Sequence, residues 1–299
     1  MNIDSQNYWL NIDKPEGYSS AKIVAIVKRI TQSNRVGHAG TLDPFATGVL
    51  PIAVGKATKT CQYITNEIKK YYCDITWGEF RDSDDKTGNV TQSNNLRPSP
   101  LQITNAISKF IGQIYQTPSS FSAIKVNGKR SYELARKGIE VKLKSRLITI
   151  SQIKLISSDQ EKSSFEMTCS KGTYVRSFAR ELSDSLGVCG YVSSLKRLIV
   201  GDFTVKNAIS LEKLKNIVTY SASKNSLLQL RDVLNFIPEV ELNKFDSLKI
   251  KQGQSISLSD SDNDLRSLSQ KPVIKVIGQG ALISLARIEN NLLKPLNNF

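Results

Sequence analysis

The sequence predicts an α+β protein with a large domain followed by a small β-rich module. Apolar residues at positions 23, 26, 27 and 30 follow helical spacing. Residues 71–77 instead alternate between apolar and polar side chains, which is typical of a strand with one buried face. From about Ile237 the pattern changes to short apolar runs separated by glycines. The chain of 299 residues is long enough for a large core and more than one domain.

Turn and capping residues mark the first elements. Residues 8–12 predict a strand that ends in the turn Asp13–Gly17. A helix follows, with Ser19 or Ser20 as its N-cap. Residues 49–54 form an apolar run that predicts a buried strand.

Helices and tight turns are expected in the middle of the chain. Residues 56–68 and the amphipathic segment 100–111 both predict helices. The dipeptide Asn127–Gly128 predicts a tight turn. Residues 131–137 predict a short helix, which Gly138 closes.

A strand and a helix are expected in the next segment. Residues 163–169 predict the strand, and the helix opens at Gly172–Thr173 and ends at Gly187. Tyr174 and Arg176 fall in the first turn of this helix, off its apolar stripe. Side chains at such positions can face a cleft.

The last third of the chain predicts further strands and one helix before the module begins. We expect strands within residues 190–201, a helix at 210–218 and a polar loop at 220–224. The β-rich module covers residues 237–299. Its segments are 249–256, 272–277 and 281–288.

The sequence contains no set of residues typical of a metal site. Residues 81–89 are acidic, but a calcium loop would need an oxygen ligand where Lys86 stands and a terminal glutamate. The four cysteines form no CxxC pair and there is one histidine, so no zinc set is present. We expect no metal and no cofactor.

The charge of the chain points to a polyanionic partner. The formal net charge is +14, with a pI near 9.5. Nucleic acid is the first candidate and an anionic membrane surface the second. Residues 119–150 are rich in lysine and arginine, although charge alone also fits a solvated face. Without a signal-peptide pattern or an apolar run of about 18 residues, the protein is expected to be cytoplasmic and to have no membrane segment.

Residues 37–51 are the most informative stretch. They contain three glycines, two prolines, the single histidine His38 and one carboxylate, Asp43. Because Asp43 precedes Pro44, it is biased towards an extended conformation on a stiff loop. By itself the dipeptide also fits an ordinary Asp–Pro turn. No second acid lies nearby, so a catalytic Asp43 would act alone, as a nucleophile.

This stretch, GHAGTLDPFATGVLP, resembles motif II of the TruB family of tRNA pseudouridine synthases. Other segments resemble the family in the same order, from about Asn11 to about Phe203. They are DKPEGYSS, KKYYCDITWG, SSFSAIKVNGKRSYELARKGIEV and CSKGTYVRSFARELSDSLG. The resemblance implies a pseudouridine-synthase catalytic fold at residues 1–236, with a mixed, largely antiparallel sheet flanked by helices. It also implies a basic, RNA-gripping insertion at 119–150. Residues 237–299 resemble a PUA-type RNA-binding domain, although a small β-barrel without an RNA role fits equally.

The resemblance implies isomerisation of a T-loop uridine of tRNA, at position 55, to pseudouridine. That reaction breaks the N1–C1′ bond and joins C5 to C1′, so it needs neither a redox cofactor nor a metal. Asp43 is the implied nucleophile, and attack at C1′ or at C6 both remain open. The implied partner is the T-arm of tRNA, and the protein is expected to be a monomer.

The resemblance also implies roles for other residues. Tyr71 stacks on the flipped-out base, with its hydroxyl close to it, and Arg176 orients Asp43 and keeps it ionised. The remaining implied contacts are Tyr174 as a second pocket tyrosine, Leu195 as an apolar wall and His38 beside the flipped-out loop. Without the resemblance, Tyr71 would be interpreted as sheet packing and Arg176 as a surface arginine.

Two alternatives remain at this point. The first is a non-catalytic RNA-binding protein or tRNA-folding chaperone that uses the same surface. The second is an enzyme of the same class with another RNA site. The combination of Asp43, Tyr71 and Arg176 favours an enzyme, because a pure RNA binder needs no lone carboxylate in an anion-binding cleft.

Overall fold

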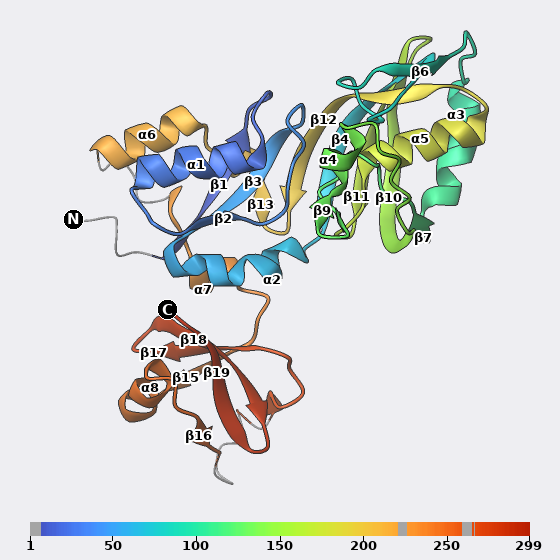
Figure 1. The fold of residues 1–299 in the computed structure, drawn as a ribbon. Coiled ribbons are helices and arrows are strands. Elements are labelled where there is room, and N and C mark those ends of the chain that lie inside the picture. The colour runs from blue at the N-terminus through green and yellow to red at the C-terminus, as the bar shows by residue number, and fades with distance from the viewer. Residues whose placement is uncertain (1–6, 221–225, 259–264, 266) are drawn as a thin grey trace.

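The computed structural model describes residues 7–220, 226–258, 265 and 267–299, and it confirms the predicted α+β fold. A ten-stranded sheet forms the large domain, and the C-terminal module lies below it in Figure 1. In spatial order the main path of the sheet is β14 (Leu228–Gln229), β1 (Tyr8–Lys14), β3 (Thr47–Val54), β12 (Gly190–Val200), β4 (Lys69–Trp77), β11 (Lys162–Cys169), β10 (Arg146–Ser158) and β7 (Gly112–Gln116). Off this path, β2 (Val36–His38) pairs with β3, and β13 (Phe203–Thr204) pairs with β12.

One parallel contact joins the two halves of the sheet. Neighbouring strands pair antiparallel along the rest of the path, but β3 and β12 run parallel and share only the pairs Thr47–Lys196 and Gly48–Arg197. The sheet is therefore mixed and largely antiparallel, as expected. Because so few residues pair between β3 and β12, loops from both halves of the sheet can meet over this seam.

Helices α1 (Ser20–Thr31) and α6 (Leu211–Tyr220) cover the half that contains β1 and β3 (Figure 1). Ser19 caps α1 by accepting a hydrogen bond from the Lys22 amide, as predicted. The apolar stripe of α1 includes Ile23 and Val27, both fully buried. This packing fixes the start of α1, and the start of α1 in turn anchors the loop that carries Asp43.

The helix predicted at 56–68 is only partly correct. The chain forms a 3-10 helix, η2 (Gly55–Thr60), then the short α2 (Cys61–Thr65), and β4 already begins at Lys69. Thr58 and Thr60 donate their hydroxyls to main-chain carbonyls three residues earlier. Such local bonds compete with regular helix, which accounts for the 3-10 geometry. Strand β1 is also longer than predicted, since it includes Asp13 and Lys14.

Helices α3 (Pro100–Ile107) and α5 (Val175–Leu186) pack on the other half of the sheet (Figure 1). A capping box at Ser99 starts α3, and the short η3 (Ser108–Phe110) ends the segment. Gly187 closes α5 in the left-handed conformation, as predicted. The strands β5 (Glu79–Arg81) and β6 (Val90–Ser93) form a separate hairpin around the acidic loop.

The basic segment contains a short helix and a hairpin whose two strands are not part of the large sheet. The hairpin pairs β8 (Lys125–Val126) with β9 (Lys129–Arg130), and Asn127 and Gly128 both have positive φ, which confirms the predicted turn. The helix is α4 (Ser131–Ala135). Residues 146–150, however, lie in β10 of the sheet, where Ile148 and Ile150 are buried.

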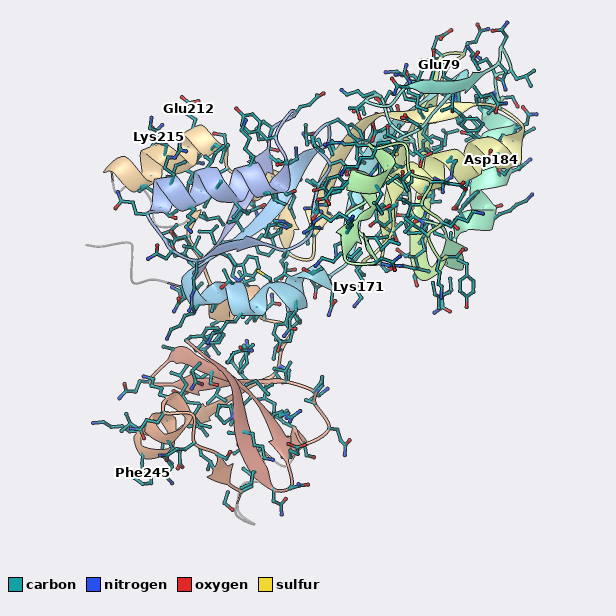
Figure 2. The ribbon with its side chains drawn as sticks, in the orientation of Figure 1. Glu79, Lys171, Asp184, Glu212, Lys215 and Phe245 are labelled. Atoms are coloured by element: carbon teal, nitrogen blue, oxygen red, sulfur yellow. The ribbon has the colours of Figure 1, made fainter. Side chains whose placement is uncertain are left out.

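The C-terminal module is a five-stranded sheet with one helix against it. Its spatial order is β15 (Glu239–Leu242), β17 (Ile274–Gly278), β18 (Ala281–Glu289), β19 (Leu292–Asn298) and β16 (Ile256–Ser257). Part of the expected β segment 249–256 instead belongs to helix α8 (Lys244–Lys251), which Asn243 caps. Phe245 projects outward from α8 (Figure 2) and is 67% exposed. The predicted loop at 220–224 falls almost entirely on residues 221–225, outside the described residues.

An apolar cluster joins the module to the large domain. Val273 and Leu285 of the module share it with Trp9 of β1 and Leu234, which follows α7 (Leu230–Val233). A short 3-10 helix, η4 (Val205–Asn207), precedes α6. Within the described residues, no helix is long and apolar enough to cross a membrane.

Candidate active site

Asp43 lies on a loop between β2 and β3 that is anchored at several points. The Ser20 hydroxyl at the start of α1 donates to the Leu42 carbonyl at 3.0 Å and accepts from the Leu42 amide at 2.8 Å. The buried Lys14 ammonium donates to the Pro44 carbonyl at 3.2 Å. Leu42 and Phe45, on either side of Asp43, are buried in the core of the half of the sheet that contains β12 and β4. The predicted rigid presentation of one carboxylate therefore has a structural basis.

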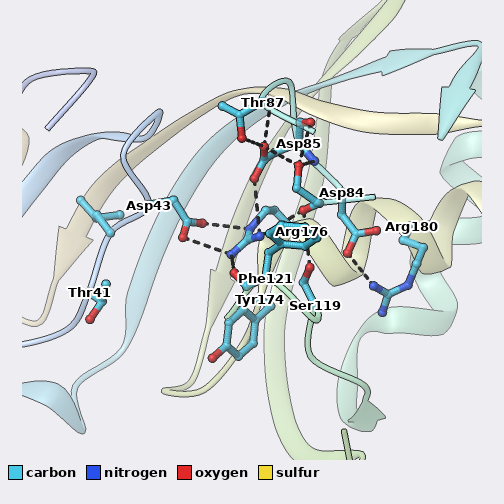
Figure 3. Close-up of polar contacts among 12 residues, drawn as sticks. Thr41, Asp43, Asp84, Asp85, Thr87, Ser119, Phe121, Tyr174, Arg176 and Arg180 are labelled. Atoms are coloured by element: carbon cyan, nitrogen blue, oxygen red, sulfur yellow. Dashed lines mark hydrogen bonds and ion pairs between the residues drawn. The ribbon is translucent and has the colours of Figure 1, made fainter. Parts of the chain in front are cut away.

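Arg176 binds Asp43 with two hydrogen-bonded contacts (Figure 3). Its Nε lies 2.9 Å from Asp43 Oδ2, and its Nη2 lies 3.1 Å from Asp43 Oδ1. The same guanidinium donates to the carbonyls of Ser83 and Phe121, each at 3.0 Å. Its side chain is only 4% exposed, so it is not a surface arginine. A fork of this kind holds a carboxylate in one orientation.

The acidic loop supplies a second carboxylate at this site, which sequence reasoning missed. Asp85 Oδ2 lies 3.5 Å from Arg176 Nη1, and its Oδ1 accepts from the Ser83 hydroxyl and from both the amide and hydroxyl of Thr87. The preceding Asp84 pairs with Arg180 at 2.6 Å (Figure 3). The acidic loop thus binds arginines of α5. The aspartates of this loop are visible in the sequence, but their spacing does not indicate which arginines they bind.

Burial and charge act in opposite directions on Asp43. Burial raises the pKa of its carboxyl, and the Arg176 guanidinium is the largest influence that lowers it. The charge of Asp85 raises it further, while Lys14 lowers it. The Asp43 side chain is still 32% exposed, so a substrate can reach it. The site thus presents one accessible carboxylate whose ionised form depends on Arg176.

Tyr71 and Leu195 lie in the same buried cluster as Leu42 and Phe45 of the Asp43 loop. Tyr71 comes from β4 and is 9% exposed. Burial raises the pKa of its hydroxyl, and the guanidinium of Arg197, which lies opposite Tyr71 on β12, acts against this rise. Arg197 is a further residue that sequence reasoning missed. Tyr71 and Leu195 thus belong to the core against which the Asp43 loop packs.

Tyr174 is held beside Arg176 by its main chain (Figure 3). Its amide donates to Gln116 Oε1 at 2.8 Å, and its carbonyl accepts from Gln116 Nε2 at 3.1 Å. Burial raises the pKa of the Tyr174 hydroxyl. His38 ends β2 on the other side of the loop, and burial lowers its pKa, so the imidazole is neutral at pH 7. Among the described residues, neither His38 nor Leu195 forms a hydrogen bond or ion pair with Asp43.

No group of three or more histidine, cysteine or acidic side chains within the described residues has the arrangement of a metal site. The polar groups around Asp43 are instead the Arg176 guanidinium, the Asp85 carboxylate that shares it, and the Lys14 ammonium held by carbonyls. This arrangement can supply a nucleophile, aromatic surface and hydrogen bonds to a planar polar ligand.

The fold matches two solved structures over nearly all of its length. One match is a Cbf5–Nop10–Gar1 complex, with a TM-score of 0.72, 19% identity and coverage of 100% of this chain and 86% of the other. A second is an H/ACA RNP bound to a substrate RNA containing 2′-deoxyuridine, with a TM-score of 0.71, 18% identity and coverage of 98% and 84%. At this identity the likeness shows the fold alone.

The sequence comparisons define the family. Residues 28–175 match the model of the TruB family pseudouridylate synthase, N-terminal domain. A protein of Anaplasma phagocytophilum named tRNA pseudouridine synthase B is 45% identical over 295 residues, covering 97% of this chain and 98% of its own. A protein of the same name in Rhodospirillum rubrum is 40% identical, covering 96% and 94%. The chain belongs to the TruB family and is a pseudouridine synthase.

Proposed function

We propose that this protein converts the uridine at position 55 in the T-loop of tRNA to pseudouridine, with Asp43 as the nucleophile. The tRNA substrate is supported by the name of its full-length relatives, tRNA pseudouridine synthase B. The role of Asp43 is supported by its contacts, because a carboxylate that remains accessible while Arg176 grips both of its oxygens is oriented for attack.

The reaction conserves every atom of the substrate. The N1–C1′ bond breaks, the base turns, C5 bonds to C1′, and the proton on C5 leaves while N1 gains one. Asp43 forms a temporary bond to the substrate and is released, at either C1′ or C6. Tyr71 shares a buried cluster with Leu42 and Phe45 of the Asp43 loop, which supports a role for its phenol as a relay for the C5 proton.

The base must leave its stack before it can reach Asp43. We propose that Tyr71, Tyr174 and Leu195 receive it, that His38 contacts the loop it leaves, and that the segment 119–145 grips the T-arm. The basic residues there support an RNA contact. They are Lys125, Lys129, Arg130, Arg136, Lys137, Lys142 and Lys144. The module at 237–299 would add further RNA contacts to the catalytic domain at 1–236, with the protein acting as a monomer in the cytoplasm.

The decisive experiment replaces Asp43 with Asn and supplies an unmodified tRNA transcript. The amide keeps the shape of the side chain but is a poor nucleophile, so we expect binding without product. Pseudouridine has the mass of uridine, so the readout is a pseudouridine-specific chemical label located by reverse transcription. Asp184→Asn, at an exposed position of α5 (Figure 2), makes the same charge change and should stay active.

A wild-type rate in Asp43→Asn, with deamidation excluded by peptide mass, would remove Asp43 as the nucleophile. Product at another tRNA position would instead retain the chemistry and reject the T-loop assignment. A non-catalytic RNA chaperone predicts that wild-type protein yields no product at all.

A further inference from the structure

Arg197 is a buried arginine on β12 that contacts the segment carrying Asp43. Its side chain is 1% exposed. Its Nη2 donates to the Gly40 carbonyl at 3.0 Å, its Nη1 to the Thr41 carbonyl at 3.4 Å and its Nε to the Val49 carbonyl at 2.8 Å. These carbonyls lie on both sides of Asp43 in the sequence. Arg197 therefore holds the Asp43 loop at the seam where β3 and β12 join the two halves of the sheet.

Arg197 also lies beside Tyr71. The two residues are directly opposite one another in the antiparallel pairing of β12 with β4, so their side chains share one face. The Arg197 guanidinium opposes the rise that burial causes in the pKa of the Tyr71 hydroxyl. Since a guanidinium can only donate hydrogen bonds, it leaves the Tyr71 O–H available to a different acceptor.

The partners of Arg197 are uncharged, so its positive charge acts on the groups around it. It contributes to the lowered pKa values of Lys14, Lys69 and His38. For Tyr71, burial is the main cause of a raised pKa, and the nearby Cys169 and Asp43 also raise it, while Arg197 opposes them. A buried arginine costs folding free energy unless its N–H groups are bonded, and here the bonds go to the parts of the active site.

We propose that Arg197 is a positioning residue for the reaction: it joins the Asp43 loop to the Tyr71 hydroxyl and sets the spacing at which both meet the same base. The carboxylate and the phenol come from different elements, and Arg197 bonds to the Asp43 loop from the strand position directly opposite Tyr71. This role rests on the proposed function, because it assumes that both groups act in the isomerisation.

The test is a double-mutant cycle on single-turnover rate at saturating tRNA, with Arg197→Met and Tyr71→Phe. A residue that acts through the Tyr71 hydroxyl loses that part of its effect once the hydroxyl is gone. We expect each single variant to be slow and the double variant to retain about tenfold more activity than the product of the two losses predicts. The tRNA affinity should change little in all three.

Lys69→Met is the matched control. Lys69 is also a buried cation on β4, and its ammonium likewise bonds to carbonyls, those of Thr65 and Glu67. The fold loss of single-turnover rate in Lys69→Met should multiply with that in Tyr71→Phe, as expected for a residue with a structural role only. If Arg197→Met does not fold, Arg197→Lys is taken through the same cycle.

Multiplicative losses in the Arg197 cycle would overturn the proposal, and so would full activity in Tyr71→Phe or in Arg197→Met. These results differ from a failure of the proposed function. In that case the wild-type protein itself forms no pseudouridine in the T-loop.

Discussion

Arg176 Nε lies 2.9 Å from Asp43 Oδ2, although the two residues are 133 positions apart in the chain. The contact joins the loop after β2 to the first turn of α5 and so closes the site across the two halves of the sheet. Asp85 approaches the same guanidinium at 3.5 Å. One arginine between two carboxylates can neutralise only part of their charge, which makes the protonation of Asp43 sensitive to its neighbours.

The first prediction concerns the pH dependence of activity in Arg176→Met. Burial already raises the pKa of Asp43, and removal of the guanidinium takes away the main influence that lowers it. Because the ionised carboxylate is the reactive form, the acid limb of the single-turnover rate should move to higher pH. At a pH below the pKa of Asp43, a rise of one unit in that pKa lowers the rate about tenfold. Arg176→Lys, which keeps the charge, should shift it less. An acid limb at the wild-type pH in Arg176→Met would mean that another group controls it.

The second prediction concerns the salt dependence of tRNA binding. The basic segment is exposed, and phosphate contacts release counterions, so affinity should fall steeply as salt increases. Lys129→Gln combined with Arg130→Gln should weaken binding and reduce the log–log salt slope by about one to two. Lys215→Gln, on the exposed face of α6 (Figure 2), should leave both unchanged. An equal loss in that control would indicate a diffuse charge effect in place of a local RNA contact.

Local sequence rules predicted the parts of the fold whose residues are close in the chain. The Ser19 cap, the Asn127–Gly128 turn and the Gly187 end of α5 depend on neighbouring residues and are correct. The Asp43 loop was also anticipated from its glycines and prolines. Errors occurred where a local feature competed with helix pattern, as at Thr58 and Thr60 in η2.

The partners of the site residues could not be predicted in the same way. The contact of Arg176 with Asp85 depends on how the acidic loop folds over α5, which no local pattern encodes. Arg197 looks like an ordinary strand residue next to Lys196, and bulges in β12 interrupt the alternation that would reveal which of the two is buried. The resemblance to the TruB family named Asp43, Tyr71 and Arg176, with Arg176 as the partner of Asp43, but it named neither Asp85 nor Arg197.

The third prediction concerns the C-terminal module. Removal of residues from 237 onward should weaken tRNA binding and spare chemistry at saturating tRNA, because the proposed site residues lie earlier. It should also lower the melting temperature, since Trp9 and Leu234 lose Leu285 as a buried neighbour. Leu285→Ala in the full chain should cost about 2–5 kcal/mol of stability. Phe245→Ala, at an exposed position, should cost little.

An inactive but folded truncation at saturating tRNA would mean that the module does more than bind. An unchanged melting temperature in Leu285→Ala would show that the cluster between module and large domain contributes little to stability.

The last prediction concerns Gly48, where the two half-sheets meet. Its φ is +96°, and a Cβ there would lie 2.3 Å from the main-chain oxygen of Arg197. A main-chain atom cannot move aside as a flexible side chain can, so Gly48→Ala must push β3 away from β12 and displace Arg197 with it. We expect a lower melting temperature and a large loss of single-turnover rate. Gly112→Ala is the matched control, because Gly112 has a similar φ of +106° but nothing within 4 Å of the added Cβ. It carries only the backbone strain, about 1–2 kcal/mol, and should keep its rate. Equal rates in the two variants would show that the spacing of the half-sheets does not control the chemistry.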